Sequence, residues 1–421
     1  MYDIVVVGAG MIGSAAGRYA SSIPNLKVCL IGPDEVTERN IDDPHDVFGA
    51  YYDEGRITRS TDPDRVWSIL ARRSIDRYRE IEKLSGIKFY EERGFLSVGT
   101  VGNAYIEQVQ QCVTEQGIRC NKDVRKLKEQ FPYLDLPRND KWIFEMSQAG
   151  IINPRRLVNA QQKMALKNGC DIVRGIVNKV TRCVDNNGDY VMRIQTDTGE
   201  ECVAKKVLLA PGAFTASRDL LGTDLVPDVY LKPTNVCLAE ITESDAQMLR
   251  SMPAVTYFGK GNKGWWDDIA SNERGNSGFY MLPPIRYPDG KYYLKLGNCP
   301  EFQGNNDIQT AADLKTWYCL KDETVLSKAL GRLIQTLIPG VKMKSFKPDR
   351  CVIVETPTSR PYLDMLHSQL GLVTGGNGWA AKSSDEIGRL AVGMIMGGIQ
   401  DEELTADMFT TRYKMRSQSK L

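Results

Sequence analysis

Three glycines near the start of the chain have the types and spacing of a phosphate-binding turn. The apolar run at 4–7 leads into Gly8, Gly10 and Gly13, and a helix-forming stretch follows. In such a unit the first glycine permits the tight turn, the second lets the backbone approach a pyrophosphate, and the third lets the helix pack on the strand. The N–H groups at the helix start then face the phosphates. The pattern predicts a dinucleotide-binding protein without saying which dinucleotide is bound.

Two further apolar runs, at 206–210 and 371–374, also end in glycine turns. The glycines concerned are Gly212, Gly375, Gly376 and Gly378. Glycine has no Cβ, so turns of this kind let a ligand come close to the backbone. We expect both turns to contribute to cofactor binding.

The second predicted strand, at 27–31, should end on an acidic residue that binds the ribose hydroxyls of the dinucleotide. Here that position falls at Gly32, with Asp34 and Glu35 just beyond. Either carboxylate could reach back. We take Asp34 as the candidate and leave the assignment open.

The composition fits a two-domain globular protein. The chain has 421 residues, of which 42% are apolar and 25% charged, the usual range for such proteins. A net charge of +1 argues against a nucleic-acid binder, which usually has a basic excess. No window holds the roughly 18 apolar residues that a membrane span needs, and no signal-peptide pattern opens the chain. We expect no nucleic-acid partner and no membrane segment.

Cysteine and histidine usage limits the chemistry. The 10 cysteines form no C-x-x-C pairs and read as reduced intracellular thiols. The 2 histidines, His45 and His367, are too few for a histidine-rich metal site or a Ser-His-Asp triad. We expect no metal, and we interpret both histidines as loop residues.

Periodicity and turn signals give the remaining elements. The sequence predicts helices at 63–85 and 154–167 and strands at 172–183 and 189–196. Asn153 and Pro154 suit the cap and first position of the second helix, and the Asn-Gly pair at 187–188 suits a hairpin turn. From 229 to 345 the chain changes to short strands rich in aromatic and β-branched residues, with a helical segment at 310–337.

This order predicts an α/β protein, α+β overall, in which a Rossmann-type domain is interleaved with an antiparallel-sheet substrate domain. We place the first domain at 1–85, 150–228 and 346–421, and the second at 86–149 and 229–345.

Several motifs together resemble a known family. The chain combines the turn at 8–13, the run Leu-Leu-Ala-Pro-Gly-Ala-Phe at 208–214, and a C-terminal glycine turn followed by Lys382. This combination resembles the flavin-dependent amine oxidases of the D-amino-acid-oxidase superfamily, above all monomeric sarcosine oxidase and the peroxisomal sarcosine and pipecolate oxidases. The resemblance spans nearly the whole chain and is weaker in the middle. It implies that the dinucleotide is FAD.

The resemblance also implies where the substrate acid group binds. The segment Gly55-Arg56-Ile-Thr-Arg59 resembles the family's R-x-x-R segment, in which the first arginine lies against the flavin and the second binds the substrate carboxylate. A guanidinium pairs with a carboxylate through two hydrogen bonds. Lys382 matches the second cation of this carboxylate site, and Tyr280 is a candidate for the pocket lining.

The same resemblance assigns two residues to the flavin. Cys351, in Cys-Val-Ile-Val-Glu-Thr-Pro, matches the cysteine that carries FAD through a thioether. Lys295, in Leu-Lys-Leu-Gly, matches a lysine over the flavin ring, whose charge stabilises the anion formed as oxygen is reduced. The alternative readings are a buried structural cysteine and an exposed strand lysine.

Three pocket positions depart from the family pattern. Cys299 replaces a histidine, Ile353 replaces a tyrosine, and Trp379 stands where a histidine often lies. These positions shape the amine side of the pocket, so we expect a secondary amino acid larger than sarcosine. Trp265 and Trp266 could form an entrance lid.

The sequence therefore predicts an FAD-dependent oxidase of N-substituted amino acids. It would oxidise a C–N bond to an imine and reduce O2 to H2O2, with L-pipecolate, saccharopine, sarcosine or another N-alkyl amino acid as substrate. Three alternatives stay open: a flavin dehydrogenase with a different acceptor, an oxidase of D- or primary amino acids, and a non-catalytic flavin-binding protein.

The final residues Ser419, Lys420 and Leu421 form a tripeptide that the peroxisomal import receptor reads. We expect a peroxisomal monomer whose partners are this receptor, a small amino-acid substrate and O2.

Overall fold

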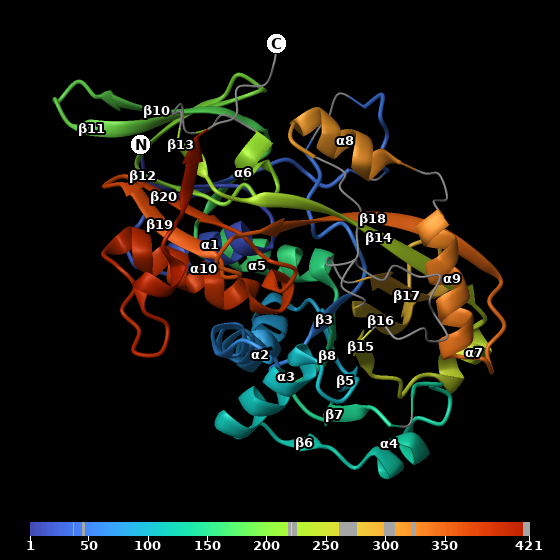
Figure 1. Ribbon diagram of the computed structural model, residues 1–421. Helices are drawn as coiled ribbons and strands as arrows, with labels where there is room; N and C mark the ends of the chain where they lie inside the picture. The colour runs from blue at the N-terminus through green and yellow to red at the C-terminus, as the bar shows by residue number, and fades with distance from the viewer. Residues whose placement is uncertain are drawn as a thin grey trace.

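In the part of the chain that the structure describes, a small three-stranded sheet lies between two large sheets (Figure 1). The structure is a computed structural model that describes residues 1–36, 38–43, 47–137, 139–217, 220, 225–260, 276–298, 308–320 and 325–415. The predictions that concern His45, Trp265, Trp266, Cys299 and the terminal tripeptide lie outside the described residues. Across those ranges, no helix combines the length and apolar character needed to cross a membrane.

The first large sheet is built around parallel strands. Its members are β1 (Tyr2–Val7), β2 (Val28–Ile31), β9 (Asp171–Val173), β10 (Val177–Val184), β11 (Tyr190–Thr196), β12 (Glu201–Leu209), β19 (Tyr362–His367) and β20 (Leu370–Thr374). The order is β10-β11-β12-β1-β2-β9, and β20 pairs in parallel with the later half of β12. The central β1 is apolar on both faces, because neighbouring layers cover both sides of a parallel sheet.

Four helices pack beside this sheet: α1 (Met11–Ser21), α2 (Arg65–Ser85), α5 (Pro154–Lys167) and α10 (Ala380–Met396). In Figure 1, α1, α5 and α10 lie side by side below β12 and β20. Gly388 allows α10 to approach α1, since a Cβ there would lie 2.6 Å from the Cβ of Ala15. This close contact lies in the middle of α10 and holds that helix against α1.

The second large sheet is mostly antiparallel. Its strands are β5 (Phe95–Gly99), β6 (Cys120–Asn121), β7 (Lys141–Glu145), β14 (Tyr230–Ile241), β15 (Ala254–Lys260), β16 (Asn276–Arg286), β17 (Tyr292–Asn298) and β18 (Ser345–Glu355). They follow the order β18-β14-β17-β16-β15-β5-β7-β6. Helices on this side are α3 (Ala104–Glu115), α4 (Val124–Gln130), α7 (Glu243–Met248), α8 (Ala311–Cys319) and α9 (Val325–Leu337).

A small sheet, β3-β8-β4, connects the two halves. It consists of β3 (Arg56–Thr58), β4 (Tyr90–Glu92) and β8 (Gly150–Ile152). The remaining elements are α6 (Phe214–Ser217), β13 (Leu225–Pro227), the 3-10 turn η2 (Ala406–Phe409) and β21 (Tyr413–Met415). Strand β3 begins with Arg56 and is followed by Arg59, and it lies between the two large sheets (Figure 1).

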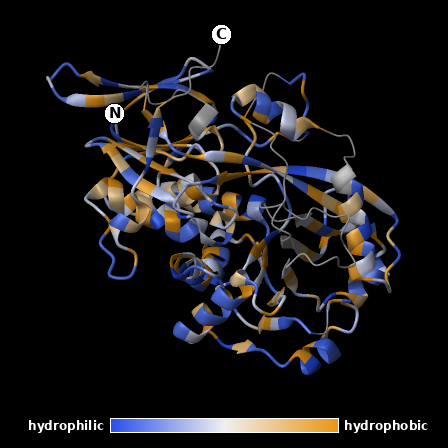
Figure 2. Ribbon diagram, viewed as in Figure 1, coloured by the Kyte–Doolittle hydropathy of each residue, from blue (hydrophilic) through white to orange (hydrophobic). Residues whose placement is uncertain are grey.

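Hydrophobic residues concentrate where helices meet sheets, and the peripheral helices alternate hydrophobic and hydrophilic residues (Figure 2). This alternation is typical of helices with one buried face. Separate apolar clusters lie in the two halves, one around Trp67 and Leu390 and one around Trp142 and Leu333.

The predicted fold class is confirmed, with three local differences. The strand expected at 172–183 is divided at Gly175, because β9 pairs with β2 while β10 turns away to pair with β11. The helical segment at 310–337 contains two helices, α8 and α9. Strand β18 pairs along β14, so 346–355, which we grouped with the first domain, belongs to the second sheet. The domain boundaries themselves stay a prediction.

Candidate active site

The turn from β1 into α1 has the geometry needed to approach phosphates. Gly8 has φ +111°, and a Cβ on it would lie 2.2 Å from the carbonyl oxygen of Ala210. A Cβ on Gly13 would lie 1.7 Å from the carbonyl oxygen of Gly8. Gly10 has open space at its Cβ position, and α1 begins there without a side-chain cap or an acidic residue in its first turn. This helix start therefore suits an anion.

A second uncapped helix start follows β20. Gly375 (φ +80°) and Gly378 (φ +78°) form the turn into α10. Between them Asn377 donates its side-chain amide to the carbonyl oxygen of Gly375 at 2.6 Å and accepts the N–H of Thr356 at 2.9 Å. The helix then begins after Trp379 without a side-chain cap. Both turns present backbone to the site, as a bound dinucleotide requires.

A cavity of about 570 Å³ runs along these turns. It is lined by most of the residues that the sequence singles out: Gly8, Gly10, Gly13, Arg56, Arg59, Gly212, Tyr280, Cys351, Gly375, Gly376, Gly378 and Lys382. Gly212 has φ +56°, a left-handed conformation that favours glycine. Asp34 does not line the cavity; it is exposed and pairs with Arg174 at 3.0 Å. Its ribose contact stays a prediction.

Arg59 and Lys382 come together from distant parts of the chain. Arg59 follows β3, whereas Lys382 lies in the first turn of α10, and both line the cavity. Nη1 of Arg59 lies 3.2 Å, and Nζ of Lys382 lies 2.8 Å, from the same oxygen of Asp62, Oδ2. All three residues are at most 3% exposed. The structure thus brings the two predicted cations to one point of the cavity wall.

Burial and neighbouring charges act in opposite directions on these cations. Burial lowers the pKa of Lys382, and the carboxylate of Asp62 offsets part of this effect. Burial also disfavours the charge of Arg59, but Tyr105, Asp62 and Glu145 together raise its pKa. Because arginine stays charged in proteins, Lys382 is the member of the pair whose charge depends on its surroundings.

Tyr105, on α3, is a site residue that sequence reasoning missed. Its hydroxyl accepts a hydrogen bond from Nη2 of Arg59 at 2.9 Å, and its ring stacks on Phe258 with centroids 3.6 Å apart. Tyr105 and Gln108 are three positions apart on one face of α3, and both line the cavity. In the sequence, the cap residue Asn103 indicates the start of this helix, but no local pattern indicates that Tyr105 contacts Arg59.

Glu145, on β7, fixes the loop between Arg59 and Asp62. It is buried and accepts the backbone N–H groups of Ser60 and Thr61, each at 3.0 Å. The hydroxyl groups of both residues also donate to it. A carboxylate from the second sheet thus holds the loop that carries the cation site.

Lys295 lies in a buried ion pair and does not line the cavity. It is 1% exposed on β17, and its ammonium donates to Asp53 and to the carbonyl oxygen of Gly55, the latter at 3.3 Å. Asp53 also pairs with Arg56, which does line the cavity. Burial lowers the pKa of Lys295 far below its usual value, and Arg56 lowers it further. Lys295 is therefore connected to the cavity through Asp53 and Arg56.

Cys351 faces the cavity from β18. It lies opposite Thr234 of β14, which lines the same cavity. Its Sγ is 3.9 Å from Nη2 of Arg56, and its carbonyl oxygen accepts the indole N–H of Trp317 at 2.9 Å. The thiol thus lies beside a guanidinium on the cavity wall.

Three further residues that the sequence singles out add aromatic or aliphatic surface to the cavity. Tyr280, Ile353 and Trp379 line the cavity. A Cβ on Gly297 would lie 2.5 Å from the ring of Tyr280, so only a residue without a side chain leaves room for the ring there. Trp379 packs against Trp67 with ring centroids 5.7 Å apart.

Comparisons with known proteins agree with this geometry. Monomeric sarcosine oxidase from Arthrobacter sp. (strain TE1826) is 23% identical over 417 residues, which cover 96% of this chain and 95% of that protein. Monomeric sarcosine oxidase from Bacillus sp. (strain B-0618) is 26% identical over 416 residues, which cover 96% of this chain and 94% of that protein. N-methyl-L-tryptophan oxidase from Citrobacter koseri is 21% identical, covering 96% and 97%.

Solved structures share the fold. NikD, described as an unusual amino acid oxidase essential for nikkomycin biosynthesis, matches with a TM-score of 0.73 at 18% identity, covering 98% of both chains. L-proline dehydrogenase from P. horikoshii matches with a TM-score of 0.71 at 14% identity, covering 97% of this chain and 96% of that chain. Residues 3–394 match the family described as FAD dependent oxidoreductase (DAO). The chain therefore belongs to this family of FAD-dependent oxidoreductases.

Proposed function

We propose that the protein is an oxidase of secondary amino acids that binds the substrate carboxylate between Arg59 and Lys382. The observation that carries this proposal is the meeting of these two cations in the cavity that the glycine turns line. A guanidinium and an ammonium at one point form a natural receptor for a carboxylate. Holding the acid group there orients the amine end of the substrate.

The bound FAD supplies the chemistry, namely acceptance of a hydride equivalent from the carbon next to nitrogen and transfer of the electrons to O2. The residues of the chain supply binding and a dry environment. Arg59 and Lys382 are buried at the cavity wall, so their attraction for a carboxylate is stronger than it would be in water. The reaction needs no metal, and the imine product hydrolyses in solution.

The walls support a substrate larger than sarcosine. The similar proteins act on sarcosine and N-methyl-L-tryptophan, as their names state. In this chain Tyr105, Phe258, Tyr280 and Trp379 provide aromatic surface to the cavity, and Ile353 provides aliphatic surface. We therefore favour N-alkyl amino acids with an apolar or cyclic side chain, such as L-pipecolate, ahead of sarcosine; saccharopine remains a candidate.

We also propose that FAD is attached covalently to Cys351. The position of its Sγ on the cavity wall, 3.9 Å from Arg56, supports the attachment. Acid denaturation of the purified protein tests it, because covalent flavin stays with the polypeptide and mass spectrometry then maps it. Cys351→Ser should release all flavin. Intact flavin released from the wild type would remove the covalent link and leave the oxidase proposal standing.

A dehydrogenase that passes electrons to another acceptor is the second candidate. Two observations favour it: Lys295, the residue assigned to the oxygen reaction, does not line the cavity, and L-proline dehydrogenase shares the fold. The test is to supply a panel of N-methyl and cyclic secondary amino acids in air and to measure H2O2. The oxidase proposal predicts one H2O2 per substrate oxidised. Turnover only with an artificial dye would favour the dehydrogenase.

A further inference from the structure

The two cations assigned to the substrate carboxylate already share a carboxylate of the protein. Asp62 is fully buried, with 0% exposure, whereas Arg59 and Lys382 reach the cavity. Its Oδ2 contacts both cations, at 3.2 Å and 2.8 Å respectively. Asp62 therefore lies behind the cations, on the protein side.

Resting on the proposed function, we propose that Asp62 is the positioning residue of the carboxylate site. It holds Arg59 and Lys382 side by side and balances the charge of Lys382, so that both cations face one substrate carboxylate. Lysine is a flexible chain with a point charge, and it needs such a partner to stay in one place. A buried ammonium without a counter-charge is costly and tends to lose its proton.

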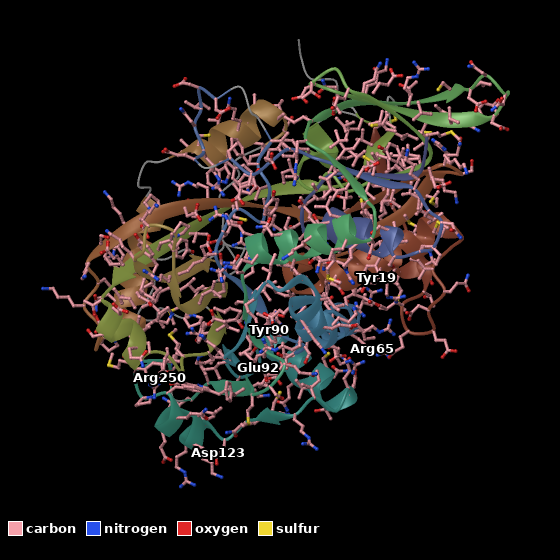
Figure 3. All side chains as sticks on the ribbon, turned by 180° about the vertical axis from the view of Figure 1, so that it is seen from behind. Tyr19, Arg65, Tyr90, Glu92, Asp123 and Arg250 are labelled. Atoms are coloured by element: carbon pink, nitrogen blue, oxygen red, sulfur yellow. The ribbon has the colours of Figure 1, made fainter. Side chains whose placement is uncertain are left out.

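Hydrogen bonds from two neighbouring helices hold the part of α10 that carries Lys382. Three residues further along α10, Asp385 accepts hydrogen bonds from Arg18 and Arg77, each at 2.7 Å, and from Tyr19 at 3.0 Å. Tyr19 is labelled in Figure 3, which shows the molecule from behind the view of Figure 1. These contacts tie α10 to α1 and α2, so the backbone of Lys382 is fixed independently of Asp62.

The charges that face the Lys382 ammonium come from Asp62, Arg59 and Glu145. Burial lowers the pKa of Lys382 and Arg59 lowers it further, whereas Asp62 and Glu145 raise it. Glu145 is engaged by Ser60 and Thr61, and Asp62 is the carboxylate that accepts the hydrogen bond of Lys382. On the packed helix α2, Tyr78 donates its hydroxyl to the carbonyl oxygen of Lys382. Four arginines of α1, α2 and α10 pair with Asp385 and Glu386 instead of facing the ammonium: Arg18, Arg73, Arg77 and Arg389.

The test measures binding rather than turnover. Benzoate, a non-reacting carboxylate, and benzamide, its neutral counterpart, are titrated into the holoenzyme by calorimetry between about pH 6 and about pH 9. The wild type should bind benzoate more tightly than benzamide, with a decline only toward the alkaline end. In Asp62→Asn the protonated fraction of Lys382 falls, so the decline should begin at least about one pH unit lower and approach tenfold per unit. An unchanged pH profile would overturn the proposal.

Matched variants separate charge from packing. Asp62→Glu keeps the carboxylate, so its pH profile should follow the wild type even if its affinity differs; a decline shifted as in Asp62→Asn would contradict the proposal. Glu82→Gln changes another buried carboxylate, which pairs with Arg79 away from the cavity, and it should leave the benzoate profile unchanged.

Further outcomes keep the two proposals distinct. If Asp62→Asn does not fold, Lys382→Met tests the titrating group: the alkaline decline should vanish, and its persistence would refute the role given to the Asp62–Lys382 pair. If the wild type binds benzoate and benzamide equally, the carboxylate site of the proposed function is wrong, whatever Asp62 does.

Discussion

Asp53 and Lys295 form a buried ion pair that joins the loop before β3 to strand β17, across 242 positions of sequence. The same oxygen of Asp53 contacts Arg56, and its other oxygen accepts the hydroxyl of Tyr287 at 2.9 Å. Asp62 repeats this arrangement with Arg59 and Lys382. Lys295 and Lys382 thus each share one buried carboxylate with one arginine, and we expect both groups to control function and stability.

Asp53→Asn should lower the free energy of unfolding by about 3–5 kcal/mol, because it leaves Lys295 buried without its counter-charge. Urea denaturation of the holoenzyme measures the change. The double variant Asp53→Asn with Lys295→Met should recover part of the loss, since no buried charge then lacks a partner. Equal losses in the single and double variants would contradict the pairing.

Lys295→Met should slow the reaction with oxygen while leaving anaerobic reduction by substrate largely intact. A single preorganised charge of this kind is worth roughly 100-fold in rate. Stopped-flow absorbance separates the two half-reactions. If the oxygen reaction is indifferent to the change, Lys295 serves the fold through Asp53 and is not the oxygen site.

Gly10→Ala should give a folded protein with little bound FAD. The added methyl group meets no protein atom within 4 Å, and Gly10 lines the cavity, so the methyl takes space that the cofactor needs. Gly17→Ala on the same helix is the control, because its Cβ would make ordinary contacts at 3.6 Å with Leu30. Flavin absorbance per polypeptide and circular dichroism report the result; full flavin content in Gly10→Ala would refute the assignment.

Tyr105→Phe should raise KM for the amino-acid substrate by roughly 10–150-fold and change kcat much less. The variant keeps the ring stacked on Phe258 but removes the hydroxyl that orients Arg59, and a hydrogen bond to a charged group contributes about 1.5–3 kcal/mol. Steady-state kinetics with substrate and with its amide check this, since the amide should be far less affected. A fall in kcat at unchanged KM would place Tyr105 in a different role.

The sequence predicts the elements that depend on local signals. The glycine turns, the Asn153 cap of α5 and the hairpin at 187–188 are found where their residue types require them. The family resemblance adds Arg59 and Lys382, which the structure brings together. These residues could be found because each belongs to a short motif.

The partners of the site residues could not be found in this way. Asp53 stands three positions before Arg56 and Asp62 three positions after Arg59, a spacing that hints at local ion pairs. Their bonds to Lys295 and Lys382 span the chain and arise only when the sheets and α10 pack. Tyr105 and Glu145 likewise act through contacts between elements that no local pattern contains.

The most direct test of the account compares an N-methyl amino acid with its amide. Each is mixed with the holoenzyme without oxygen, and the visible absorbance of the flavin is followed. Recognition of the carboxylate by Arg59 and Lys382 predicts rapid bleaching by the acid and very slow bleaching by the amide, with Lys382→Met removing most of the difference. Equal bleaching by acid and amide, or no bleaching by any secondary amino acid, would contradict the central claim.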